Sequence, residues 1–124
     1  RTLGYGRAFE YVFFAVALPN FATARVRERV GISEYHLAQL TVASKLAELT
    51  EGKVPTDASE LVPSYLSDKP KDPFAETGVS YPFHKEHETF YGIGPDEEDD
   101  RLEVLYSPSN GTVSNGDIAP YDFR

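Results

Sequence analysis

Apolar side chains recur at helical spacing through the first half of the chain and predict one long amphipathic helix. One row, spaced by three, four or seven residues, comprises Val26, Val30, Leu37, Leu40 and Ala47. A second row, which widens the same face, comprises Tyr35, Val42, Leu46 and Leu49. The opposite face carries charged side chains. We therefore expect a helix over residues 1–50 with a broad apolar face that needs a cover.

Two positions mark the course of this helix. Pro19 removes one backbone hydrogen bond and crowds the preceding turn, so we expect a kink or break there. Gly52 follows the last periodic residue and can adopt the left-handed conformation that ends many helices. Residues 1–24 are expected to be an assembly or anchor part, and residues 25–50 the part that packs on a head.

The periodicity changes after the helix, and residues 51–124 are expected to form a small globular head. Asp57 or Thr56 can cap a short helix that Pro63 closes. Alternation of two around Tyr81 and again around Tyr91 predicts a hairpin, with its turn at residues 84–88. Residues 102–106 and 112–113 are candidate further strands, separated by the tight-turn pair at 110–111. The predicted class is α+β, a long N-terminal helix packed on a small antiparallel sheet.

The charge distribution restricts the functions to consider. The net charge is −8, five acids run from Asp96 to Asp100, and arginines gather at positions 25, 27 and 29. A chain without a broad basic face is not expected to bind nucleic acid specifically. Cysteine is absent, which excludes thiol catalysis and disulfides. No phosphate-binding loop, nucleophile elbow or zinc-hydrolase helix occurs, so we do not expect an enzyme.

Aromatic residues are concentrated near the N-terminus, and they cover more than one face of the predicted helix. We expect them to contact neighbouring subunits, lipid or another protein. The apolar stretch is too short to cross a membrane alone, although it could dip into one. The residues expected to form the assembly helix are Phe9, Tyr11, Phe13, Phe14, Leu18, Pro19 and Phe21.

Several motifs occur in an order that resembles the type IV pilin and type II secretion pseudopilin superfamily. Residues 17–22 (Ala-Leu-Pro-Asn-Phe-Ala) are similar to the junction between the buried and exposed halves of a pilin helix. Head motifs at residues 52–55, 60–66, 71–74 and 92–96 follow in the order of a major pseudopilin, and residues 106–118 resemble its terminal segment. The start of the chain departs from the family, because Thr2 stands where the family has a glutamate.

The resemblance implies a pilin-like fold and a calcium site in the C-terminal loops of the head. Carboxylates at close spacing are the hard oxygen ligands that Ca²⁺ prefers. The alternative is a solvated acidic turn, because the spacing of an EF-hand is absent. The candidate calcium ligands are Asp96, Asp99, Asp100 and Asp117.

Other polar motifs allow two interpretations each. His84 and His87 lie in the predicted hairpin turn, where their spacing is not that of a helical zinc pair. His36 is expected to be a surface or satisfied histidine. Asn110 begins a glycosylation sequon, but Asn-Gly is equally a turn signal.

Two functional hypotheses follow from the helix and the resemblance. In the first, the chain is a structural subunit of a pilus-like filament, assembles with copies of itself through the N-terminal helix, and lies outside the cell or on its surface. In the second, it is a single-copy pilin-like subunit whose aromatic helix docks into a larger membrane-associated complex, for example in a periplasm. The localisation in both comes from the resemblance.

Overall fold

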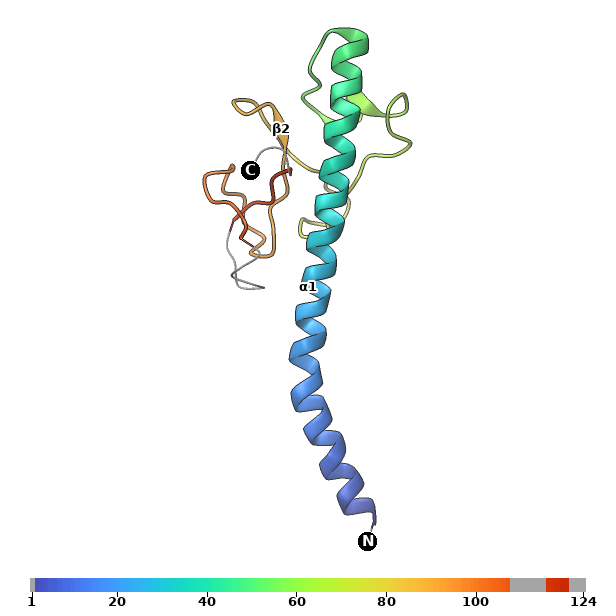
Figure 1. Cartoon of the computed structure of the whole chain (residues 1–124), viewed down its shortest axis with the longest axis vertical. Coiled ribbons are helices and arrows are strands. Elements are labelled where there is room, and N and C mark those ends of the chain that lie inside the picture. The colour runs from blue at the N-terminus through green and yellow to red at the C-terminus, as the bar shows by residue number, and fades with distance from the viewer. Residues whose placement is uncertain (1, 108–115, 121–124) are drawn as a thin grey trace.

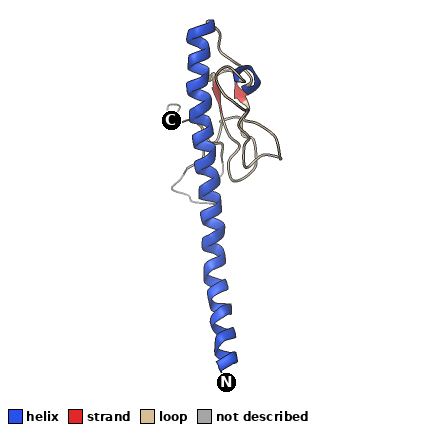
Figure 2. Ribbon diagram, turned by 90° about the vertical axis from the view of Figure 1, so that its right-hand side faces the viewer, coloured by secondary structure: helices blue, strands red, loops and turns tan. Residues whose placement is uncertain are grey.

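The structure is a computed structural model that describes residues 2–107 and 116–120, with side chains described from residue 23 onward. One helix, α1 (Thr2–Glu51), dominates the molecule. It is followed by a short 3₁₀ helix, η1 (Ala58–Leu61), and by two strands, β1 (Phe83–His84) and β2 (Thr89–Phe90). The loops of the head gather beside the C-terminal half of α1, and the N-terminal part of α1 extends beyond them (Figures 1 and 2).

Helix α1 starts earlier than its apolar periodicity and continues through Pro19. The sequence predicted a kink or break at this proline, and the structure contains one continuous helix from residue 2 to residue 51 with a gentle curve (Figure 1). The expected break is therefore wrong. The C-terminal end is where the sequence placed it, because Gly52 has a φ of 73° and its N–H donates to the Glu48 carbonyl at 2.8 Å.

The short helix after α1 confirms the predicted cap. Asp57 has extended backbone angles, and its carboxylate accepts the Ser59 N–H at 2.8 Å. Leu61 at the end of η1 is completely buried, and η1 contacts α1. The cap therefore fixes a turn that delivers an apolar side chain to the helix.

The strands are shorter and fewer than the sequence predicted. Phe83 pairs with Phe90 and His84 with Thr89 in one antiparallel hairpin, whose turn is where the sequence placed it. Elsewhere in the described residues, pairing is limited to isolated bridges: Lys71 with Ser80, Gly92 with Ile118, and Leu105 with Asp117. Residues 102–106 were expected to form a strand and instead contain turns, with positive φ at Arg101 and Leu102. The candidate strand at 112–113 lies outside the described residues.

The core lies between one face of α1 and the loops of the head. From α1 it takes Leu37 and Leu40, both with no exposed surface, and smaller residues one turn away. The first apolar row of the helix is buried or partly buried, whereas all four members of the second row are exposed. The expectation of one broad covered face is thus half right. The buried core residues are Val30, Leu37, Leu40, Ala43, Ala47, Ala58, Leu61, Phe74, Tyr81, Phe90, Tyr106 and Ile118.

Candidate functional site

The C-terminal acidic turn is organised around Asp117. This residue pairs with Leu105, and the next residue, Ile118, pairs with Gly92, so the segment is bound between two others. The Asp117 side chain has no exposed surface. Its two carboxylate oxygens accept backbone hydrogen bonds from Leu102 at 2.9 Å and from Asp100 at 3.3 Å. Asp117 therefore fixes the turn that follows the acidic run.

Two glycines let the backbone segments approach closely at this turn. Gly116 has a φ of 109°, and a Cβ there would lie 2.6 Å from the carbonyl carbon of Leu105. A Cβ on Gly94, whose φ is 78°, would collide with the carbonyl oxygen of Gly116. Only glycine fits both requirements at these positions. The fold therefore brings the acidic run and the C-terminal segment into direct backbone contact.

Two carboxylates of the acidic run, Asp96 and Asp99, are also hydrogen-bonded to the protein. Asp96 accepts the Gly116 N–H at 2.9 Å with one oxygen and the Glu98 N–H at 3.1 Å with the other. Asp99 accepts the Tyr91 hydroxyl at 2.8 Å and the Arg101 N–H at 2.9 Å on the same oxygen. These side chains hold the turn together, which a purely solvated acidic loop would not require.

Burial raises the pKa of Asp117 to about 6, and the nearby charges of Asp99 and Asp100 act in the same direction. The two backbone N–H groups act in the opposite direction because they stabilise the carboxylate. At neutral pH the ionised Asp117 therefore carries a cost in folding free energy. Within the part of the chain that the structure describes, no three histidines, cysteines or acids are arranged to hold a metal ion. The donors are nevertheless all oxygen, the chemistry that calcium takes.

A polar cluster that sequence reasoning did not find connects α1 to the head. Nδ1 of His36 lies 2.8 Å from the hydroxyl of Tyr81, and the two rings meet edge to face at a centroid distance of 5.6 Å. Burial raises the pKa of Tyr81. The phenol therefore keeps its proton, and the tautomer of His36 decides which of the two groups donates. His36 is satisfied, as expected, and its partner lies 45 residues away in the chain.

Asp72 lies close to this pair and is 4% exposed. Its carboxylate accepts the Phe74 N–H at 2.9 Å and the Ile93 N–H at 3.1 Å. Burial raises its pKa, and the two backbone bonds and His36 counteract part of that shift. The sequence Asp-Pro-Phe signalled a local turn of this type. It carried no signal that the carboxylate would be buried against a distant loop.

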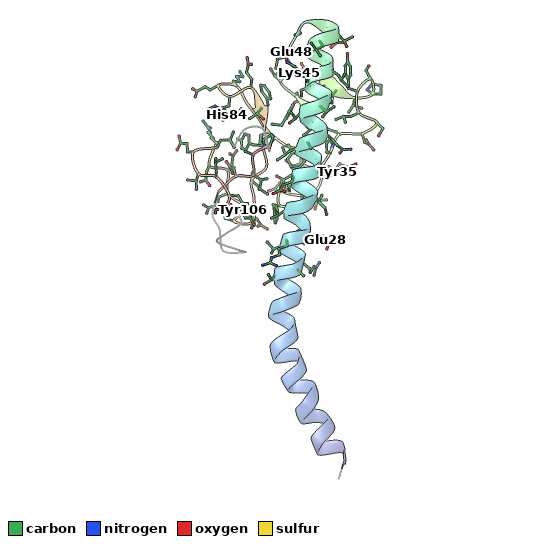
Figure 3. All side chains as sticks on the ribbon, in the orientation of Figure 1. Glu28, Tyr35, Lys45, Glu48, His84 and Tyr106 are labelled. Carbon is green, nitrogen blue, oxygen red and sulfur yellow. The ribbon has the colours of Figure 1, made fainter. Side chains whose placement is uncertain are left out.

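The two hairpin histidines lie next to each other. Their ring centroids are 4.7 Å apart, and the His87 N–H donates to Nδ1 of His84 at 3.3 Å. His84 lies on the side of α1 where Tyr106 also lies (Figure 3). The hairpin turn is therefore stabilised by a hydrogen bond from the His87 N–H to one imidazole nitrogen of His84.

Three members of the exposed second row of α1, Tyr35, Val42 and Leu46, line a shallow apolar groove of about 350 Å³, which we call the helix groove. Tyr35 is 64% exposed and Val42 is 62% exposed. Two head residues, Tyr65 and Leu66, form the other wall and pack partly against the core. The residues that line the helix groove are Tyr35, Ala38, Gln39, Val42, Ala43, Leu46, Tyr65 and Leu66.

The expected assembly residues, from Phe9 to Phe21, lie on the part of α1 that extends beyond the head, and their side chains lie outside those described. Asn110 lies outside the described residues altogether. Within the described part of the chain, no helix has both the length and the apolar character needed to cross a membrane.

Comparisons with models of protein families, with curated proteins and with solved structures found no match to this chain.

Proposed function

We propose that this protein is a pilin-like structural subunit that assembles into a filament through α1. The observation that carries the proposal is the shape of the molecule. A continuous helix of 50 residues is packed along its C-terminal half against the described part of the head, and its N-terminal part extends beyond those loops (Figure 1). Five aromatic residues occupy positions 9–21, on the part of α1 that extends beyond the described loops of the head (Figure 1). Apolar surface of this kind is stabilised by contact with other chains.

The α+β architecture and the ordered head motifs support the pilin-like assignment. Motifs similar to a pseudopilin head occupy the η1 turn and the acidic turn. A subunit whose contact surfaces differ at its two ends forms heterologous contacts, which generate open helical filaments when they do not close. Such a filament would place the N-terminal helices inside and the acidic heads outside.

Electron microscopy of the purified full chain without detergent tests this proposal. We expect uniform fibres a few nanometres wide, in keeping with the roughly 10 Å diameter of each packed helix. A Phe13→Glu, Phe14→Glu variant is expected to lose the fibres while the head keeps its melting temperature. Discrete particles in the unmodified protein would contradict the filament.

The alternative function is a single-copy subunit that docks its aromatic helix into a membrane-associated complex. The unusual start of the helix favours it, because Gly4, Gly6, Arg7 and Glu10 interrupt the apolar run that a pilin anchor has. A chain that stays monomeric at high concentration and binds lipid vesicles through residues 1–24 would support this alternative over the filament.

We further propose that the acidic turn binds calcium, with Asp96, Asp99, Asp100 and Asp117 as the side-chain donors. The support is electrostatic: a buried carboxylate whose pKa is raised, beside two more acids, would be stabilised by a cation. A higher melting temperature in millimolar calcium than in chelator is expected. Asp117→Asn should abolish that difference, and an equal melting temperature in both conditions for the unmodified protein would rule the site out.

A further inference from the structure

The helix groove is an apolar surface of α1 that the described part of the head leaves uncovered. The second apolar row of α1 forms one side of the groove, and Tyr65 and Leu66 form the other. Exposed apolar patches of this kind on a folded protein mark sites of contact with another molecule. The groove runs along α1 from residue 35 to residue 46, and exposed Leu49 extends it by one turn.

The chain's own N-terminal aromatic segment cannot fill the groove in the same molecule. Residues 9–21 and residues 35–49 belong to one continuous helix, so they cannot fold back on each other. Both segments span about 20 Å along a helix. A second copy of the chain therefore offers an apolar helix of matching length, and each copy carries both halves of the contact.

We propose that the helix groove binds the N-terminal segment, residues 9–21, of a second copy, with the two helices parallel. This inference rests on the proposed filament and names its contact surface on the head. Aligning the midpoints of the two segments places Ala15 of one copy opposite Val42 of the next. Neighbouring copies are then offset by about 40 Å along the helix axis.

Charge selects the parallel direction. Arg25, Arg27 and Arg29 are exposed and form no ion pair within the described residues. In the parallel alignment they reach the C-terminal end of the partner's α1, where Glu51 and Glu60 lie together with one base, Lys53. That end has no basic residue in its last turn, and cations are favoured there by the helix dipole.

The antiparallel alignment instead brings the arginines of the two copies together. With the same midpoints, Arg29 of one copy would lie opposite Glu28 of the other, among its Arg25, Arg27 and Arg29. Like charges at this spacing repel. The whole chain shows the same asymmetry: residues 1–33 carry five arginines and two glutamates, whereas residues 34–124 carry seven basic and eighteen acidic residues.

Disulfide cross-linking tests this contact directly, because the chain has no cysteine of its own. A variant with both Ala15→Cys and Val42→Cys is oxidised in solution and separated by denaturing electrophoresis. We expect a ladder of covalent oligomers, since each copy can link to one copy above and one below. Either single variant can form only dimers. Val42 is exposed, so its replacement should leave the head folded.

Two controls distinguish the named contact from other associations. Ala15→Cys combined with Glu103→Cys, an exposed head position outside the groove, should give no ladder. Glu51→Arg with Glu60→Arg should weaken the Ala15–Val42 ladder several-fold, and adding Arg25→Glu and Arg29→Glu should restore it. Restoration is not expected if the charges act only on folding.

The outcomes separate this inference from the proposed function. Fibres without an Ala15–Val42 ladder would overturn the groove contact and leave the filament intact. A ladder from the Ala15 and Glu103 pair in place of the Ala15 and Val42 pair would also overturn it. Absence of both fibres and ladders would contradict the two proposals together.

Discussion

The two apolar rows of α1 run side by side from residue 35 to residue 47, yet they have different surroundings. The first row is buried apart from Val26, which is partly buried: Leu37 and Leu40 have no exposed surface, and Ala47 is 2% exposed. The second row remains open, with Leu49 73% exposed. Both rows have the composition of a core. The difference shows that the head covers only one of them, and the other is available for another molecule.

The largest expected effect comes from replacing one leucine in each row and comparing the two variants. Leu40→Ala is expected to cost about 2–5 kcal/mol in the free energy of unfolding, because it leaves a cavity in the core. Leu49→Ala should change it by no more than about 0.5 kcal/mol, as for an exposed position. Chemical denaturation of both variants as monomers measures the difference. Equal costs would mean that the second row is also covered in the isolated chain.

A pair of glycines extends the comparison from side chains to the backbone. Gly116→Ala should cost about 2–4 kcal/mol, because it adds both a strained positive φ and a collision with Leu105. Gly78→Ala is the control, since its φ is 89° but nothing lies within 4 Å of the added Cβ. Thermal denaturation of the two variants should show the larger loss at Gly116. A larger loss at Gly78 would contradict the close approach at the acidic turn.

Asp117 provides the next test, of a buried carboxylate against an exposed one. Asp117→Ala should cost about 1–3 kcal/mol because two backbone N–H groups lose their acceptors. Asp68→Ala, at an exposed position, should have little effect. Measured without calcium, equal stability of both variants would show that the turn does not depend on this carboxylate.

The same residue gives a pH dependence of known sign. Its pKa is raised from 3.8 in the unfolded chain to about 6 in the folded one. The stability that it contributes is therefore fully present below pH 3.8 and is lost as the pH rises through 6. The stability of the unmodified protein relative to Asp117→Asn should accordingly fall between pH 4 and pH 7.

The smallest expected effect comes from His36. Burial lowers its pKa below 6.5, and Asp72 counteracts part of that shift. As the pH falls, the imidazole of His36 therefore becomes protonated in the unfolded chain before it does so in the folded chain. The contribution of His36 to stability is lost as the pH falls below 6.5. The unmodified protein should lose more stability between pH 7 and pH 5 than His36→Gln does. Identical pH profiles would exclude burial of the imidazole against Tyr81.

The parts of the fold that depend on local sequence could be predicted, and those that depend on distant contacts could not. The end of α1 at Gly52, the Asp57 cap and the hairpin turn are set by a few neighbouring residues, and all three are confirmed. The periodicity placed both apolar rows on one face. It could not tell which row the head would cover, because that depends on where Leu61, Tyr65 and the hairpin reach α1.

The same limit applies to the candidate site. The acidic run and Asp117 were recognised as a group, and the structure brings them into one turn through Asp100, Asp96 and Gly116. The pairing of His36 with Tyr81 and the burial of Asp72 were missed, because their partners lie 45 and 21 residues away. The residue types carried no signal for such contacts.

The central claim, that the uncovered surfaces of α1 assemble copies of this chain, is tested most directly by sedimentation velocity of the full chain over a wide range of concentrations. We predict a series of species that lengthens steadily as the concentration rises, as expected for heterologous contacts that do not close. The Phe13→Glu, Phe14→Glu variant should sediment as a monomer throughout. A single monomeric species for the unmodified chain at every concentration would contradict the claim.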